Sequence, residues 1–343
     1  MKIKSEYRVN AERIADQIAL SMKENKEFFF FVHKSVDGDC IGSACGTAEV
    51  LRNLGARARV LIGEELPYTM EFMKLNTLVC HANDVDPSIG PEDYIPFATD
   101  CCESHRMGDE CGKYFDEGIN PIIIDHHISV HLKGERVWIN GDCSSASELC
   151  YYVALILEER AGRPLIDERA AVCFLTGIVT DTGRFTYTNT EADTLICAGE
   201  LMQLGGNISE ICYNLFDRHT KENFDLITYL RSKAVLCANG KISMVTVVRS
   251  DFEKYGADDS AIDVLPTALR NIDGVELSIV LREKEDVIRC NLRSQEYFDC
   301  SIFAMSFGGG GHKRAAGFSL PRDTYKIEDV AKLVVERAKG FLR

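Results

Sequence analysis

Apolar runs typical of β-strands alternate with helical patterns in the first part of the chain. Strand patterns cover residues 27–32, 58–62, 94–99 and 121–124, and a helical pattern at 41–54 separates the first two. This alternation predicts an α/β fold, with a mostly parallel sheet joined by crossover helices. Further helical patterns, which predict helices packed around that sheet, occur at 147–159, 168–176, 190–203 and 208–216.

The pattern changes after residue 217. The polar, helix-favouring segment HTKENFDLITYLRSK predicts a helical linker over 218–237, between a larger first domain at 1–217 and a smaller α/β domain at 238–343. The second domain contains strand patterns at 242–248 and 276–281, the glycine-rich run GGGGH, read as a loop, and an amphipathic helix at 327–341. The length of 343 residues also exceeds what one hydrophobic core usually supports.

Net charge, cysteine content and apolar runs limit which partners and which cellular compartment suit the protein. The formal net charge is −14, from 39 basic and 53 acidic side chains, which argues against a wide basic surface for long duplex nucleic acid. A small anionic substrate remains compatible, because bound metal ions and a few basic side chains can invert the local field. Fourteen scattered cysteines without C-x-x-C pairs indicate reduced thiols, and the polar start lacks the apolar core of a secretory signal. The most strongly apolar run, 28–32, is far too short to span a membrane, so we expect a soluble protein, and the reduced thiols favour the cytoplasm.

Four acidic and imidazole clusters follow apolar stretches, where side chains from distant positions converge at the carboxyl ends of parallel strands. The first is His33, Asp37 and Asp39 in HKSVDGDCIGS, directly after the FFFFV strand. Two carboxylates and an imidazole at this spacing suit a metal ion. Taken alone, the cluster also fits a turn with aspartate caps.

The second cluster is centred on Asp100 in ATDCCESHRMG, at a predicted strand end. A lone aspartate there is usually a cap or turn residue, so Asp100 gains significance from the other clusters. Arg106 is a candidate for phosphate contact, and an exposed surface arginine is the equally good alternative.

The third cluster, Asp125, His126 and His127, ends the apolar run PIII. Three titratable groups are costly to bury unpaired, and a carboxylate beside a metal-binding imidazole commonly fixes its tautomer. Exposed loop histidines are the alternative. The fourth cluster is Asp181 in GIVTDTGRFTYTNT, where a small-residue helical stretch ends. Together the clusters offer enough ligands for two divalent ions that share a carboxylate.

The run GGGGH in the second domain has a physical use of its own. Its backbone N–H groups can approach a phosphate or base without an obstructing Cβ, and basic Lys313 and Arg314 follow at once. A flexible hairpin or hinge is the alternative.

With these motifs in this order, the sequence resembles the DHH phosphoesterases, and NLRS at 291–294 with FGGGGHKRAAGF at 307–318 resembles their DHH-associated C-terminal domain. The similarity is greatest to the stand-alone nanoRNase and pAp-phosphatase branch. It implies that His33 and Asp37 hold one metal, that Asp39, His126 and Asp181 hold the other, and that Asp100 bridges both. It further implies that His127 faces the phosphate and that Asp125 orients it. The implied nucleotide contacts in the second domain are Arg293, Ser294, Gly309, Gly310, His312 and Arg314.

The implied activity is hydrolysis of short oligoribonucleotides to mononucleotides, removal of the 3′-phosphate of pAp, or both. Two metals would activate a bridging water, and mixed His and Asp ligation favours Mn²⁺ over Mg²⁺. A pApA or cyclic-dinucleotide phosphodiesterase is the alternative, and an inactive nucleotide-binding regulator a remote one, because every expected ligand position is filled. A homodimer is compatible with the sequence.

Overall fold

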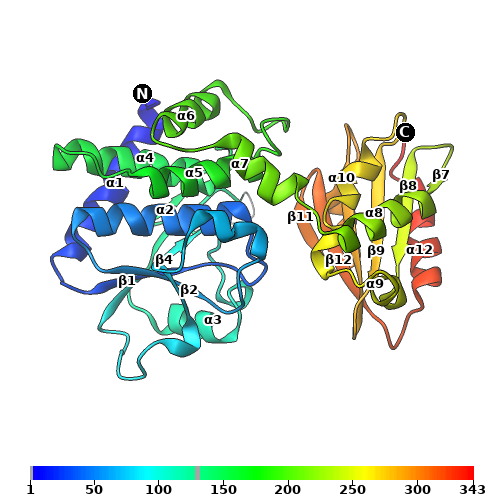
Figure 1. Ribbon diagram of the computed structural model, residues 1–343, viewed down its shortest axis with the longest axis horizontal. Helices are drawn as coiled ribbons and strands as arrows, with labels where there is room; N and C mark the ends of the chain where they lie inside the picture. Colours follow the sequence, from blue (N-terminus) through cyan, green and yellow to red (C-terminus); the bar gives the residue numbers. More distant parts are fainter. Residues whose placement is uncertain (1–2, 128–131) are drawn as a thin grey trace. The chain divides into compact units, whose positions relative to one another are not determined.

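The computed structural model describes residues 3–127 and 132–343, although the side chain of His312 lies outside the described part. The chain divides into two compact units, residues 1–217 and 218–343 (Figure 1). The α/β fold predicted from the alternating patterns is confirmed. None of the described helices is long and apolar enough to cross a membrane.

The first unit is built on six parallel strands in the order β3-β2-β1-β4-β5-β6. The strands are β1 (Glu27–Phe31), β2 (Ala58–Ile62), β3 (Val79–His81), β4 (Tyr94–Thr99), β5 (Ile122–Asp125) and β6 (Val137–Ile139). Successive strands run outward from β1 in one direction and from β4 in the other, so the order reverses between β1 and β4. Such a reversal opens a crevice beyond the strands' carboxyl ends, which is where ligands bind in open α/β sheets.

The phenylalanine run of β1 is explained by layers on both faces of this sheet. Phe28 and Phe30 belong to a core formed with α1 (Ser5–Met22), α2 (Gly38–Leu54), α4 (Ala146–Ala161) and α5 (Glu168–Asp181). Phe29 and Phe31 belong to a second core on the face covered by α3 (Asp109–Glu117). Since side chains alternate along a strand, a strand covered on both faces is apolar throughout.

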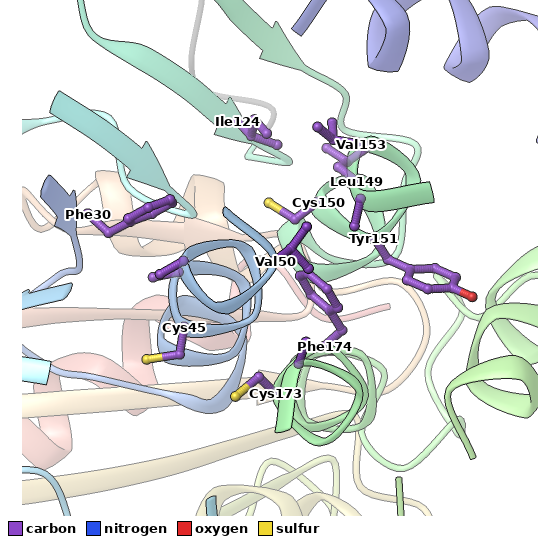
Figure 2. Close-up of a cluster of buried hydrophobic side chains, with 14 of the residues drawn as sticks. Phe30, Cys45, Val50, Ile124, Leu149, Cys150, Tyr151, Val153, Cys173 and Phe174 are labelled. Atoms are coloured by element: carbon purple, nitrogen blue, oxygen red, sulfur yellow. The ribbon is translucent and has the colours of Figure 1, made fainter. Parts of the chain in front are cut away.

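A row of glycines brings α2 and α5 together. A Cβ at Gly42 would lie 2.4 Å from the carbonyl oxygen of Cys173, and one at Gly46 would lie 2.6 Å from the Phe174 ring. At the start of α2, a Cβ at Gly38 would meet the side chain of Thr180. Figure 2 shows the buried side chains beside this contact, including those of Cys173 and Phe174. The contact places the first turn of α2 beside the last turn of α5.

Two shorter helices complete the first unit. They are α6 (Ala192–Gln203) and α7 (Ile208–Cys212), and a π-helical turn, Tyr213–Asp217, follows. The sequence predicted one helix over 208–216, whereas the chain changes from α to π geometry at Tyr213.

The second unit has a mixed sheet in the order β11-β12-β10-β9-β8-β7, in which β8 and β9 are parallel and the other neighbours antiparallel. Its strands are β7 (Val235–Cys237), β8 (Ile242–Val247), β9 (Leu277–Glu283), β10 (Val287–Ser294), β11 (Gly310–His312) and β12 (Ala315–Pro321). Helices α8 (Lys221–Lys233), α9 (Arg249–Tyr255) and α10 (Leu265–Arg270) contribute to one core, and α11 (Cys300–Met305) and α12 (Ile327–Lys339) to another.

Two local features differ from the sequence interpretation. Helix α8, expected as part of a linker, buries Leu226 and Leu230 in a core of the second unit. The run GGGGH is only partly a loop, because Gly310–His312 forms edge strand β11, which pairs with β12. Glycine has little strand preference of its own, so pairing with β12 decides the local structure.

Candidate metal centre

Asp100 lies at the reversal of the strand order, directly after β4. Its backbone φ is +57°, a left-handed conformation that costs a non-glycine residue about 1 kcal/mol or more. The Asp100 N–H donates to the carbonyl oxygen of Ile124 at 3.0 Å, which holds this residue against β5. Strained backbone at a strand end is a common property of functional sites.

One group of ligands lies on the β1 side of Asp100. His33 follows β1, and its Nε2 lies 3.5 Å from Asp37 Oδ2 and 3.7 Å from Asp100 Oδ2. Asp37 also caps α2, since its Oδ1 accepts a hydrogen bond from Cys40 N at 2.9 Å. Burial opposes protonation of His33, but Asp100 and Asp37 raise its pKa well above the usual range.

A second group lies on the other side of Asp100. His126 Nε2 is 3.2 Å from Asp181 Oδ2, 3.4 Å from Asp100 Oδ1 and 3.8 Å from Asp39 Oδ2. Asp39 comes from the first turn of α2 and Asp181 from the last turn of α5, so the glycine-mediated contact of these helices sets their spacing. Burial, reinforced by the charge of Asp100, raises the pKa of Asp39 to about 7. Burial also raises the pKa of Asp181.

The Asp39 carboxylate is held by a third helix. Its Oδ2 accepts from Ala146 N at 2.7 Å and its Oδ1 from Ser147 N at 2.8 Å, both at the N-terminus of α4. Gly177 in α5 leaves room for this arrangement, because a Cβ there would lie 1.9 Å from Ser147 Oγ. No local sequence pattern indicates this anchor, since residues 39 and 146 belong to distant segments.

His127 lies beside the two groups and is oriented by Asp125. Asp125 Oδ1 is 2.7 Å from His127 Nδ1 and accepts from His127 N at 2.9 Å. His127 Nδ1 also lies 3.5 Å from Asp100 Oδ1. With Nδ1 directed at a carboxylate, the Nε2 edge of the ring turns away from Asp125.

Two further residues, Cys40 and Arg106, lie near this edge of the sheet. Cys40 groups with His33 and Asp100 as a third candidate ligand, and burial raises its pKa to about 12. Arg106 ends a 3₁₀ turn, Ser104–Arg106, and its carbonyl oxygen accepts from Lys34 N at 2.8 Å, which ties the segments after β4 and β1 together. Within residues 3–127 and 132–343, no ion pair involves the Arg106 guanidinium.

The donor set fits divalent cations. Asp100 Oδ1 is buried and, within the described part of the chain, receives no hydrogen bond of normal geometry. Asp39, Asp181 and His126 form one group of converging donor atoms, and Asp100, His126 and His127 form another. Buried carboxylates this close repel one another unless a cation or protons compensate their charge.

Known protein families match the chain in both units. The chain matches the DHH family, N-terminal domain, over residues 27–178 and the DHHA1 domain over residues 239–341. The bifunctional oligoribonuclease and PAP phosphatase NrnA of Bacillus subtilis is 30% identical over 290 residues, which cover 84% of this chain and 87% of that protein. The chain belongs to the DHH family.

Two further proteins are similar to this chain over most of its length. The bifunctional oligoribonuclease and PAP phosphatase NrnA of Thermus thermophilus is 26% identical, over 85% of this chain and 83% of that protein. The crystal structure of an exopolyphosphatase-related protein from Bacteroides fragilis superposes with a TM-score of 0.84 at 21% identity, covering 96% of this chain and 97% of that one. The fold of each unit is therefore shared with that protein.

In the DHHA1 domain, the sequence-predicted contacts gather at one end of the sheet. Arg293 on β10 is in register with Ala315 on β12, which pairs in turn with His312 on β11. The Arg314 guanidinium donates to the carbonyl oxygens of Glu296 and Phe298, so at least part of it braces the loop after β10. Ser294 Oγ is 3.5 Å from Arg314 Nη1.

The DHHA1 glycines separate into two kinds. A Cβ at Gly309 would lie 2.3 Å from the carbonyl oxygen of Gly317 and 2.5 Å from Phe318 Cβ, so the fold itself requires glycine there. A Cβ at Gly310 would meet no atom of the described residues within 4 Å, and Gly310 has no left-handed φ. Packing therefore gives no reason for glycine at position 310.

This difference yields a prediction about the nucleotide contact. We expect Gly310→Ala to leave the melting temperature unchanged or slightly raised, and to weaken binding of a nucleotide that approaches this backbone by about tenfold. Gly309→Ala, the matched variant, should lower the melting temperature by several degrees. Thermal unfolding and titration with pAp measure both effects, and unchanged pAp affinity in Gly310→Ala would remove position 310 from the substrate site.

Proposed function

We propose that this DHH-family phosphoesterase hydrolyses short oligoribonucleotides to mononucleotides and removes the 3′-phosphate of pAp, using two divalent ions, with Mn²⁺ preferred. The observation that carries the proposal is the pair of ligand groups on either side of Asp100, with the oriented His127 beside them. The similarity to NrnA proteins supports the substrate class. The net charge of −14 favours short substrates over long duplexes.

The ligands divide between the two ions. His33 and Asp37 would hold one ion, Asp39, His126 and Asp181 would hold the other, and Asp100 would contact both. Imidazole ligands favour Mn²⁺ over Mg²⁺, which prefers oxygen. When bound, the ions supply Lewis acidity that lowers the pKa of water and neutralises charge at the phosphate.

The protein's own groups position the substrate. Asp125 holds the His127 ring, so that its Nε2 edge can donate a hydrogen bond to a phosphoryl oxygen or a proton to the leaving oxygen. Arg106 would bind a further phosphate oxygen. Arg293, Ser294, Gly309, Gly310, His312 and Arg314 of the DHHA1 domain would contact the nucleotide. Fourteen free thiols are compatible with action in the cytoplasm.

A substrate panel tests the proposal. Purified protein with Mn²⁺ would be given labelled RNA of two to five residues, a 24-residue RNA, pAp, pApA and cyclic di-AMP, with a chelator-treated sample as the control. We expect turnover of the short RNAs and pAp that disappears with the chelator. Exclusive turnover of pApA or cyclic di-AMP would favour the alternative activity, and no turnover of any substrate would contradict the proposal.

Binding of Mn²⁺ should depend on pH. Because burial raises the pKa of Asp39 to about 7, its carboxyl group is largely protonated below that pH and must lose the proton to bind a cation. We therefore expect Mn²⁺ affinity to rise as the pH increases through 7, with proton uptake by the buffer. Calorimetric titration in two buffers of different ionisation enthalpy measures that uptake, and equal apparent enthalpies at pH 6.5 would contradict the prediction.

A further inference from the structure

Asp39 is positioned from outside its own helix. Its carboxylate depends on the N–H groups of Ala146 and Ser147, so any movement of the α4 N-terminus moves this carboxylate. Ser145 caps α4, because its Oγ accepts from Glu148 N at 3.1 Å. The contacts that hold this turn in place therefore also position Asp39, a member of the second ligand group.

A buried carboxylate holds the α4 N-terminus from within. Glu148 is 2% exposed, and its carboxylate accepts hydrogen bonds from three hydroxyl groups. The Ser144 hydroxyl is one donor, Thr194 Oγ1 donates at 2.9 Å, and Tyr152 OH donates at 2.6 Å. Neutral donors on both carboxylate oxygens offset much of the cost of burying this group. The turn at Ser144 is thus tied to the interior of the first unit.

One asparagine connects this turn to the other ligand-bearing helix. Asn189 Nδ2 donates to Ser144 O at 2.9 Å and to Asp181 O at 3.1 Å. Both partners are backbone carbonyls, so only a donor group can serve at this place. Asn189 Oδ1 is buried and, among the described residues, has no partner, so the side chain acts through its NH₂ group.

We infer that Asn189 is a positioning residue for the second ligand group. It holds the segments that carry Asp39 and Asp181 at a fixed spacing. The inference rests on the proposed metal-dependent function. A change at Asn189 should affect the second ligand group alone, because the hydrogen bonds of Asn189 reach the segments of Asp39 and Asp181. His33 and Asp37 are held instead by β1 and by the cap of α2.

The test replaces the amide NH₂ donor of Asn189 while keeping the size and shape of the side chain. Asn189→Asp places a carboxylate oxygen against two carbonyl oxygens, which should separate the two segments. We expect Mn²⁺ affinity to fall about 10- to 100-fold at one of two sites, with the other site unchanged. At low Mn²⁺ the turnover of pAp should fall, and excess Mn²⁺ should restore most of it.

Asn53 supplies a matched control. Asn53 Nδ2 also makes two hydrogen bonds that join separate segments, to Leu165 O at 2.9 Å and to Asp167 Oδ2 at 3.1 Å. Asn53→Asp should therefore destabilise the metal-free protein through the same chemistry. It lies near the C-terminal end of α2, whereas Asp39 lies at the start, so Mn²⁺ binding should stay as in the wild type.

Calorimetric Mn²⁺ titration and metal-free thermal unfolding of the three proteins decide the matter without any substrate. Selective weakening of one site in Asn189→Asp, with wild-type binding in Asn53→Asp, supports the inference. Equal binding in all three, or equal weakening in both variants, overturns it. A wild type that binds Mn²⁺ but hydrolyses nothing would contradict the proposed function alone, and one that binds no Mn²⁺ would overturn both.

Discussion

Asp100→Asn is expected to lower Mn²⁺-dependent turnover of pAp and of short RNA by about a thousandfold. Asp100 is the carboxylate that the two ligand groups share, and loss of several kcal/mol of charge stabilisation corresponds to about three powers of ten in rate. Asparagine is the sharpest replacement, because it tolerates the left-handed backbone of this position while removing the charge. Steady-state kinetics with Mn²⁺ at several concentrations measures the loss.

A control must show that the Asp100→Asn variant keeps the wild-type fold. Circular dichroism of Asp100→Asn should match that of the wild type, whereas Asp100→Ala should add a stability loss of about 1 kcal/mol from the backbone conformation. Retention of more than about a tenth of the wild-type rate by Asp100→Asn would contradict its role as the shared ligand.

Gly42→Ala is expected to destabilise the first unit by at least about 2 kcal/mol. Its Cβ would lie 2.4 Å from a backbone carbonyl oxygen of α5, which cannot rotate away as a side chain could. The helices must separate, and the cost of such overpacking exceeds the gain of about 1 kcal/mol that alanine brings to a helix interior. Urea unfolding measures the change, and the altered spacing of Asp39 and Asp181 should lower Mn²⁺ affinity as well.

Gly199 in α6 is the matched glycine for this experiment. In the part of the chain that the structure describes, a Cβ there would meet nothing within 4 Å, so Gly199→Ala should stabilise the protein by up to about 1 kcal/mol through helix propensity alone. We therefore expect the free energy of unfolding to fall in Gly42→Ala and to rise in Gly199→Ala. A stability gain in Gly42→Ala would show that the α2 and α5 contact tolerates a methyl group.

The candidate metal ligands that directly follow apolar strands were the easiest part of the site to predict from the sequence. His33, Asp100 and His126 each follow an apolar strand, and the predicted parallel sheet sufficed to expect them at one edge. The order of the strands, and with it the reversal at β1 and β4, could not be read from the pattern. Strands β3 and β6 were missed because three residues are too few to show a periodicity.

The supporting contacts were less accessible to sequence reasoning. Asp39 meets α4 and Asn189 meets Ser144 across long stretches of chain, and neither contact leaves a local pattern. One signal was present, because Gly38, Gly42 and Gly46 recur every four residues and thus share a helix face. That spacing indicates a close helix contact and could have placed α2 against another helix.

The distribution of the ligands along the chain has a consequence for biosynthesis. Asp39 is in the first turn of α2 and Asp181 is in the last turn of α5, so the proposed ligand set of the second ion is complete only after most of this unit has left the ribosome. Contacts between such distant segments form late in folding. Mn²⁺ should therefore stabilise the finished domain without accelerating its folding, and nascent chains that end before Asp181 should bind the second ion poorly.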